Sequence, residues 1–221
     1  PGLVTAGSPK VAVRVPAHPL SRQLLQSLDF PLAAPSANPF GYVSPTTAQH
    51  VFEGLHGKIP YILDGGPCRV GVESTIVDFE EGRLIVRRKG GVAVEGIERI
   101  IGYKAEVRTG VEDHPVAPGQ LKSHYATSVP LYVGKVGKML PRFSGRKVCL
   151  LEFGKNLQNV PAAFRFQLSV TGDLDEAAKN LFSAMRQADS CGAAVILAEW
   201  VPDSGIGRAI NDRLRRAAMQ E

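Results

Sequence analysis

The second half of the chain alternates strands and helices, and this alternation constrains the fold more than any other feature. Short apolar runs typical of buried strands occur at 131–133, 148–153, 166–168 and 194–198. Apolar side chains at helical spacing occur at 173–188 and 208–219. Strands that alternate with helices form a mostly parallel sheet with the helices packed over it. We therefore predict an α/β unit with a Rossmann-like pattern over residues 130–221.

The first half of the chain carries a less regular mixture of the same signals. Runs typical of strands occur at 11–15, 31–34, 61–63, 73–78 and 84–88, and the turn Glu80-Glu81-Gly82 predicts a hairpin of the last two. Helical spacing occurs at 18–28, 45–55 and 94–101. A serine is a good N-cap and a proline fits the first helical position, so Ser44 and Pro45 are expected to start the second of these helices. This half is therefore predicted to be α/β as well.

Residues 108–129 form a long stretch without periodicity that contains Pro115, Pro118 and Gly119. A connection of this length inside a compact domain is unusual, and such segments are commonly linkers or functional lids. We therefore predict a first domain over residues 1–107, a linker or lid over 108–129, and a second domain over 130–221.

The composition is that of an ordinary globular protein, with 44% hydrophobic and 21% charged residues. The sequence contains no apolar run of about 18 residues and no visible signal peptide, so we expect a cytoplasmic protein without a membrane span. The chain begins at Pro1 rather than at a methionine, so we expect the true N-terminus to be absent from it. A formal charge of +5 and a pI of about 9.2 permit contact with nucleotides or RNA.

The cysteines are Cys68, Cys149 and Cys191, which are far apart in the sequence. They form no CxxC pair and show no Cys/His spacing typical of zinc ligands. We therefore expect buried thiols in a reducing compartment and no structural zinc site.

Several polar residues stand at predicted strand ends or in turns, where binding sites are usually built. Arg14 interrupts an apolar strand, and a buried guanidinium needs a carboxylate or phosphate partner; the alternative is a structural ion pair. Ser74 follows a glycine-rich loop, where its hydroxyl can bind an amino acid or a phosphate or can be an ordinary strand hydroxyl. Arg88 ends a strand before Lys89 and two glycines, which suits a phosphate contact; the alternative is a surface arginine.

The stretch 31–51 reads PLAAPSANPFGYVSPTTAQHV and joins a predicted strand to a predicted helix. Ala34, Ser36 and Asn38 are small or polar, as is needed where the backbone approaches a ligand. The free N–H groups and the dipole at a helix start near Ser44 favour an anion. We predict that this stretch holds part of a nucleotide, and the alternative is a turn followed by an ordinary helix cap.

His124 and Tyr125 stand at the end of the aperiodic stretch. An aromatic ring there can stack on a base, or it can simply anchor the loop. The sequence has no GxxxxGK[ST] motif, no GxGxxG after a strand and no GxSxG. Gly205-Ile206-Gly207 is too short to count as a ligand loop and indicates a helix entry. The catalytic residues therefore stay unknown from the residues alone.

Three stretches, taken in order, resemble the YrdC/YwlC family of threonylcarbamoyl-adenylate synthases. They are PLAAPSANPFGYVSPTTAQHV, ILDGGPCRVGVESTIVDF and VRRKGG. APGQLKSHYA followed by an α/β region resembles the long form of the family, which carries an extra C-terminal domain. The resemblance implies a YrdC-like twisted α/β sheet domain, present in part, and a smaller Rossmann-like C-terminal domain. The family's KxR motif lies upstream of its SxN motif and has no counterpart before Arg14, so we expect the N-terminal part of the catalytic domain to be missing here.

The resemblance also implies a nucleotidyltransferase that makes threonylcarbamoyl-AMP and pyrophosphate from L-threonine, bicarbonate and ATP, for the threonylcarbamoylation of adenosine 37 in tRNA. It implies Mg²⁺ bound with ATP, no metal site of the protein itself, and tRNA and other threonylcarbamoylation proteins as partners, with no membrane. The residues that match the family's ATP contacts are Lys10, Ser36, Asn38, Ser44, Arg88, His124 and Tyr125. Those that match its L-threonine contacts are Arg14, Ala34 and Ser74.

Two other functions stay open at this point. The first is an RNA-binding module without catalysis, which the basic charge favours, although aromatic residues are only 7% and no RNP-like pattern occurs. The second is a carbamoyl-transfer enzyme of the same fold with another acceptor. Threonine-dependent release of pyrophosphate distinguishes both from the synthase.

Overall fold

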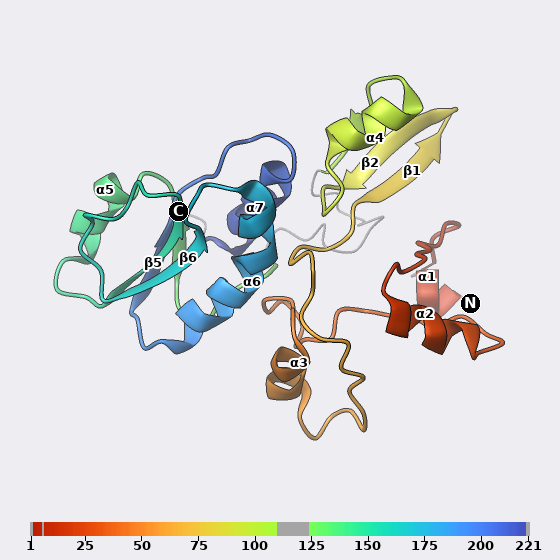
Figure 1. The fold of residues 1–221 in the computed structure, drawn as a ribbon, viewed down its shortest axis with the longest axis horizontal. Coiled ribbons are helices and arrows are strands. Elements are labelled where there is room, and N and C mark those ends of the chain that lie inside the picture. Colours follow the sequence, from red (N-terminus) through yellow and green to blue (C-terminus); the bar gives the residue numbers. More distant parts are fainter. Residues whose placement is uncertain (1, 6, 110–123, 220–221) are drawn as a thin grey trace.

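The structure is a computed structural model that describes residues 2–5, 7–109 and 124–219 (Figure 1). It contains two β-sheets, one in each half of the chain, with helices packed on them. The predicted mixed α/β class is therefore confirmed. Within these residues, no helix is both long enough and apolar enough to cross a membrane.

The C-terminal half contains a sheet of four strands in the order β4-β7-β5-β6, and every neighbouring pair is parallel. The strands are β4 Leu131–Val133, β5 Val148–Phe153, β6 Phe164–Ser169 and β7 Val195–Ala198. The helices are α5 Val136–Met139, the 3-10 helix η1 Leu140–Phe143, α6 Leu174–Ser190 and α7 Gly207–Ala217. The predicted alternation is confirmed, and only the two four-residue helices α5 and η1 were not expected, because they are too short to show a period.

Helices cover both faces of this parallel sheet. Cys149 and Leu151 of β5 lie in a core cluster with α6 and α7, whereas Val148 and Leu150 lie in a second cluster with α5 and η1. Successive side chains of a strand point to opposite faces. Burial on both faces explains why the strands read as continuous apolar runs rather than as alternating ones.

The sheet of the first half has the order β1-β2-β3, with bounds Ile76–Glu80, Arg83–Arg88 and Glu106–Val107. β1 and β2 form the predicted antiparallel hairpin, and β3 pairs with β2 in parallel. The hairpin turn consists of Glu81 and Gly82, whose φ angles of 48° and 76° are both positive, as a two-residue turn between twisted strands requires. Helix α4, Val94–Ile101, covers one face of β2.

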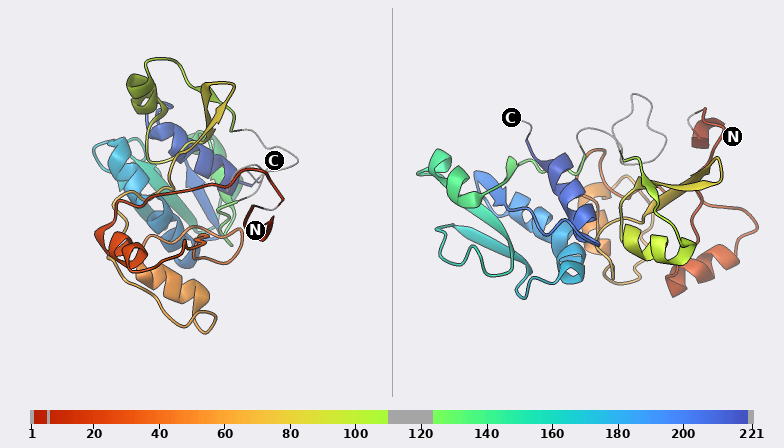
Figure 2. Two further views of the ribbon diagram at one scale, coloured as in Figure 1. Left: turned by 90° about the vertical axis from the view of Figure 1, so that its right-hand side faces the viewer. Right: turned by 90° about the horizontal axis from the view of Figure 1, so that it is seen from above.

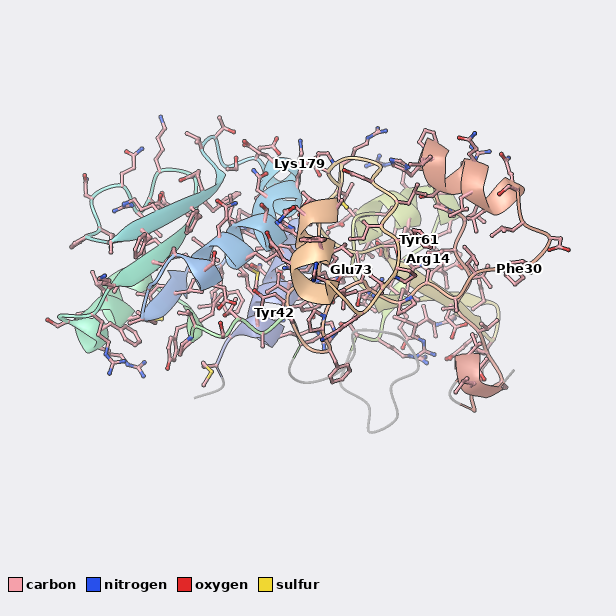
Figure 3. The ribbon with its side chains drawn as sticks, turned by 90° about the horizontal axis from the view of Figure 1, so that it is seen from below. Arg14, Phe30, Tyr42, Tyr61, Glu73 and Lys179 are labelled. Carbon is pink, nitrogen blue, oxygen red and sulfur yellow. The ribbon has the colours of Figure 1, made fainter. Side chains whose placement is uncertain are left out.

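The strands predicted at 11–15, 31–34 and 61–63 are wrong, because all three segments are irregular. Their apolar side chains are largely exposed, with Val13 at 81% and Tyr61 at 89% of full exposure. Tyr61 is labelled in Figure 3. A strand needs a neighbour that pairs with its N–H and C=O groups, and the described residues provide none for these runs. The predicted burial of Arg14 fails for the same reason, since this residue is exposed.

The remaining helices of the first half are α1 Gly2–Thr5, α2 Pro19–Gln26 and α3 Ala48–Leu55. The helix predicted at 18–28 is confirmed by α2, but the expected start at Ser44 and Pro45 is wrong. Helix α3 is capped by Thr47, whose side-chain oxygen accepts a hydrogen bond of 3.2 Å from the His50 N–H. Ser44 is thereby left out of the helix, and its hydroxyl points to another partner that is described below.

The two halves meet along α6 and α7, as the views in Figure 2 show. Arg186 of α6 donates a hydrogen bond of 2.6 Å from Nη2 to the carbonyl oxygen of Val43. The hydroxyl of Tyr42 donates one of 2.8 Å to Asp189 Oδ2. The Arg186 guanidinium also lies 4.8 Å from the centre of the Tyr42 ring. The loop before α3 is therefore fixed to the C-terminal half.

Gly96→Ala in α4 is expected to stabilise the protein by about 0.5–1 kcal/mol. Glycine loses more backbone freedom on folding than alanine does, and a Cβ at this position meets nothing within 4 Å. Urea unfolding followed by circular dichroism measures the effect. A lower midpoint for the variant than for the parent protein would contradict it.

Candidate functional site at the junction of the two halves

Glu73 lies at the centre of the junction between the two halves (Figure 3). Its Oε1 accepts a hydrogen bond of 3.0 Å from the Ser44 hydroxyl. Its Oε2 accepts two from Arg213 of α7, of 3.0 Å from Nε and 2.9 Å from Nη2. Burial raises the pKa of the Glu73 carboxyl, but the charges of Arg213 and Arg88 outweigh it and hold the pKa below its ordinary value. Glu73 is therefore a carboxylate that joins both halves of the chain.

Arg88 closes strand β2 beside this carboxylate. It donates hydrogen bonds to the Ser74 carbonyl oxygen, of 3.1 Å from Nε and 2.9 Å from Nη2, and one of 3.3 Å to the Ser74 hydroxyl. Burial lowers the pKa of Arg88, Glu73 raises it, and the positive charges of Arg213 and Arg14 lower it further. Arginine nevertheless stays protonated in proteins. The guanidinium and the exposed Ser74 hydroxyl thus form one polar surface, and the charge of Arg14 acts on it.

His124 and Tyr125 pack next to the same groups. Their ring centroids are 4.1 Å apart, and Tyr125, which is 1% exposed, stacks on Phe182 of α6 at 5.2 Å. The Arg213 guanidinium lies 5.7 Å from the centre of the Tyr125 ring. Burial lowers the pKa of His124, and burial raises that of Tyr125 to about 12. At neutral pH the two aromatic side chains are therefore uncharged, and they lie beside Arg88 and Arg213.

The chain that follows this aromatic pair docks on the loop before α3. The Ala126 N–H donates a hydrogen bond of 2.9 Å to the Gly41 carbonyl oxygen, and Ala126 forms a parallel bridge with Tyr42. Tyr125 has a φ of 64°, a left-handed conformation that is uncommon outside glycine and is held here by the packing of its ring. Most of the predicted lid, residues 110–123, lies outside the described residues.

The structure therefore brings together Ser44, Ser74, Arg88, His124 and Tyr125, five of the residues that the sequence singled out.

The other candidate residues are not joined to this group by direct contacts. Lys10 is exposed, and its Nζ forms ion pairs with two carboxylates of strand β1, Asp78 at 2.8 Å and Glu80 at 3.6 Å. Ala34 and Ser36 are exposed in irregular chain. Asn38 is half-buried, and its Nδ2 donates to the carbonyl oxygens of its neighbour Pro39, at 2.8 Å, and of Tyr42, at 3.1 Å.

Sequence reasoning missed Glu73 and Arg213. A signal for Arg213 does exist, because Ile210, Arg213, Leu214 and Ala217 recur at helical spacing and all lie on the buried side of α7. A charged residue on an apolar helix face needs a partner. No comparable signal marks Glu73, which the sequence places at the start of the predicted strand 73–78, directly after a glycine-rich loop.

The described residues contain no group of three His, Cys, Asp or Glu side chains placed to hold a metal ion. The carboxylate nearest to the candidate site, that of Glu73, already accepts from Ser44 and Arg213. That the protein provides no metal site of its own therefore stays a prediction.

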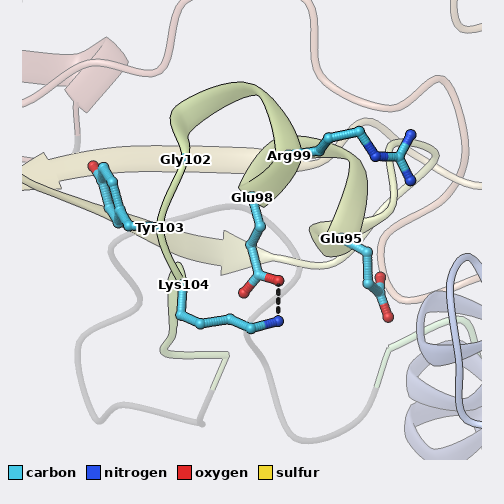
Figure 4. A pocket seen from close by; sticks show the side chains of 6 residues that line it. All are labelled: Glu95, Glu98, Arg99, Gly102, Tyr103 and Lys104. Carbon is cyan, nitrogen blue, oxygen red and sulfur yellow. Dashed lines mark hydrogen bonds and ion pairs between the residues drawn. The ribbon is translucent and has the colours of Figure 1, made fainter.

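An open hollow also lies against α4 (Figure 4). It is lined by Glu95, Glu98, Arg99, Gly102, Tyr103 and Lys104. Lys104 Nζ lies 2.7 Å from Glu98 Oε2, and its side chain is 88% exposed. A solvated ion pair of this kind contributes little energy, and this hollow shares none of the residues gathered at Glu73.

The two α/β halves thus place hydroxyls, a buried guanidinium group and an aromatic pair at their junction, and groups of this kind can contact an anionic ligand. Two family models match the chain: "Threonylcarbamoyl-AMP synthase, C-terminal domain" over residues 92–219, and "Telomere recombination" over residues 1–90. The chain belongs to the threonylcarbamoyl-AMP synthase family.

Relatives from an archaeon and a bacterium support this assignment. The threonylcarbamoyl-AMP synthase of Pyrococcus abyssi is 39% identical over 99% of this chain and 66% of its own length. That of Bacillus subtilis is 36% identical over 97% of this chain and 65% of its own length. A crystal structure of P. abyssi Sua5 complexed with L-threonine superposes with a TM-score of 0.89 at 38% identity, covering 99% of this chain and 66% of that one. The chain thus spans slightly less than two thirds of the relatives it matches.

Proposed function

We propose that this chain contributes to an L-threonylcarbamoyladenylate synthase, which makes threonylcarbamoyl-AMP and pyrophosphate from L-threonine, bicarbonate and ATP. The observation that carries the proposal is the junction at Glu73, where Arg88, Ser74 and Ser44 meet the His124–Tyr125 pair. The Arg88 guanidinium and the Ser44 and Ser74 hydroxyls suit phosphate and carboxylate groups, and the half-buried His124 ring beside Tyr125 suits a base.

The reaction needs positioning and charge stabilisation more than a protein nucleophile. Threonine and bicarbonate condense to a carbamate and water. A carbamate oxygen then attacks the α-phosphorus of ATP while the bond from this phosphorus to the bridging oxygen of the β-phosphate breaks and pyrophosphate leaves. Phosphoryl and nucleotidyl transfers of this kind are accelerated by aligned reactants and by cations that neutralise the developing charge. Arg88 is buried and fixed by Ser74, so its charge needs little reorganisation in such a step.

The substrate contacts follow the same assignment. We assign Ser44, Arg88, His124 and Tyr125 to ATP, and Ser74 to L-threonine. The assignments of Lys10, Ser36 and Asn38 to ATP, and of Arg14 and Ala34 to threonine, rest on the resemblance in sequence. A relative crystallised with L-threonine supports an amino-acid pocket in this fold. Mg²⁺ is expected to enter bound to the ATP phosphates, and bicarbonate, tRNA and the other threonylcarbamoylation proteins are the further partners proposed, in the cytoplasm.

Pyrophosphate release tests the proposal. The longest natural chain that contains these residues is incubated with Mg·ATP, bicarbonate and each of the twenty amino acids. Release that depends on threonine and bicarbonate is the expected result. Equal release with other amino acids would indicate a different acceptor. No release, combined with salt-sensitive tRNA binding, would indicate an RNA-binding module instead and would overturn the proposal.

Ser74→Ala is expected to weaken L-threonine binding by about tenfold, because the hydroxyl beside Arg88 is lost as a partner for the amino acid. Isothermal titration with threonine measures the change. Ser27→Ala is the matched control, since Ser27 Oγ donates to the Leu24 carbonyl oxygen at the end of α2, away from the candidate site. Equal affinities of the Ser74 variant and the control would remove Ser74 from the threonine pocket.

A further inference from the structure

We infer that Arg213, on helix α7 of the C-terminal half, is a positioning residue for the candidate site: it acts through Glu73 on Ser44 and through Lys89 on Arg88. This inference rests on the proposed function for its catalytic consequence. It assigns a role to the C-terminal half, which is to hold the segments around Glu73 and Lys89 of the first half in fixed positions relative to each other.

The first observation is the burial and bonding of Arg213. Its side chain is 0% exposed, although arginine is among the residue types least often fully buried. Its Nη1 donates 2.6 Å to the Lys89 carbonyl oxygen and 3.1 Å to Asp212 Oδ2, while Nε and Nη2 both reach Glu73. One guanidinium therefore contacts two different segments of the first half at the same time.

The second observation is that these two segments form one packed unit. The Gly91 N–H donates 2.9 Å to the Glu73 carbonyl oxygen, and Thr75 Oγ1 donates 2.6 Å to the Val92 carbonyl oxygen. A Cβ on Gly90 would lie closer than 3.0 Å to backbone atoms of residues 73–75. With so little space between them, a shift of one segment moves the other.

The third observation is what each segment carries. The segment around Glu73 holds the Ser44 hydroxyl through Oε1 and continues into Ser74. The segment around Lys89 follows directly on Arg88, which donates to Ser74. A displacement of about 1 Å in groups that position a substrate can lower a rate about a hundredfold. Arg213 lies over the Tyr125 ring at 5.7 Å, and its hydrogen bonds go to Glu73, Lys89 and Asp212. It therefore acts on Ser44, Ser74 and Arg88 by positioning them.

Arg213→Lys is the sharpest variant, because lysine keeps the charge but cannot contact Glu73 and the Lys89 carbonyl oxygen with a planar fork. In the longest natural chain we expect kcat/KM for adenylate formation to fall by about tenfold to a hundredfold. Arg215→Lys is the matched control on the same helix, where the exposed arginine lies over the Trp200 ring at 5.4 Å, and its kcat/KM should stay within about twofold.

A double-mutant cycle with Ser44→Ala separates positioning from simple stability. If Arg213 acts through Glu73 on Ser44, the effect of Arg213→Lys on kcat/KM shrinks when Ser44 is already alanine. If the role of Arg213 were purely structural, Arg213→Lys would lower kcat/KM by the same factor in the parent protein and in Ser44→Ala. It would also lower the thermal midpoint of unfolding by the same amount in both. Additive losses would overturn the inference.

Hydrogen exchange provides a readout that does not depend on activity. Amides of residues 73–75 and 89–91 should exchange faster in Arg213→Lys than in the parent protein or in Arg215→Lys. Unchanged exchange there overturns the positioning role even if pyrophosphate is released. Faster exchange in a protein that releases no pyrophosphate with threonine supports the positioning role while the proposed function fails.

Discussion

Arg88→Ala is expected to lower kcat/KM for adenylate formation by about a hundredfold to a thousandfold, the loss found when a buried group that stabilises a developing charge is removed. The variant removes the buried cation at the end of β2 and also the three hydrogen bonds that hold Ser74. Both the ATP contact and the threonine contact should therefore suffer. Steady-state pyrophosphate release at varied ATP and threonine measures the change.

Arg88→Lys and Arg83→Ala complete this experiment. Lysine keeps the charge but not the planar fork that grips the Ser74 carbonyl oxygen, so an intermediate loss is expected. Arg83 starts the same strand and is exposed, so its alanine variant should retain activity within about twofold. If all three variants matched the parent protein, Arg88 would have no part in the reaction.

The C-terminal half could be predicted from the sequence because each of its longer helices and strands shows its own local pattern of apolar residues. β5 and β7 read as apolar runs since both faces of the sheet are covered. α6 begins one residue later than predicted, and the expected first residue, Asp173, is its N-cap and accepts from the Glu176 N–H at 2.7 Å. Sequence and structure agree where each element carries its own signal.

The first half could be predicted only in part, because strand formation there depends on partners that are remote in sequence. The hairpin β1-β2 is local and was found. The run 11–15 has a strand pattern but no neighbouring strand among the described residues, and it stays irregular with Val13 and Val15 exposed. An alternating apolar pattern shows that a segment can form a strand, but the segment forms one only where a neighbouring strand pairs with it.

The candidate site shows the same division. The resemblance in sequence identified Ser44, Ser74 and Arg88, which stand near one another in the structure. Glu73 and Arg213 are 140 positions apart, and their contact could not be inferred without the fold. The expected N-cap role of Ser44 was wrong because Thr47 caps α3, and the hydroxyl of Ser44 is used by Glu73 instead.

Gly71→Ala is expected to destabilise the protein by about 3 kcal/mol, at the upper end of what overpacking usually costs. Gly71 is buried against α6, and an added Cβ would lie closer than 3.0 Å to the carbonyl oxygens of Ala178 and Lys179. Both obstacles are backbone atoms of a helix, which cannot rotate away as a flexible side chain can. The two halves must therefore separate locally or the loop must shift.

The shift should reach the site, because Glu73 lies only two residues beyond Gly71. A displaced loop draws the Glu73 carboxylate away from Arg213, so that this fully buried guanidinium loses one of its two carboxylate partners, Glu73 and Asp212, in the described part of the chain. The variant is therefore expected to unfold at lower urea concentration, and its residual folded fraction should make less pyrophosphate. Gly96→Ala, with open space around its Cβ, is the control of opposite sign. A Gly71 variant as stable as the parent protein would show that the halves can move apart at α6 at no cost, and that this contact does not hold the site together.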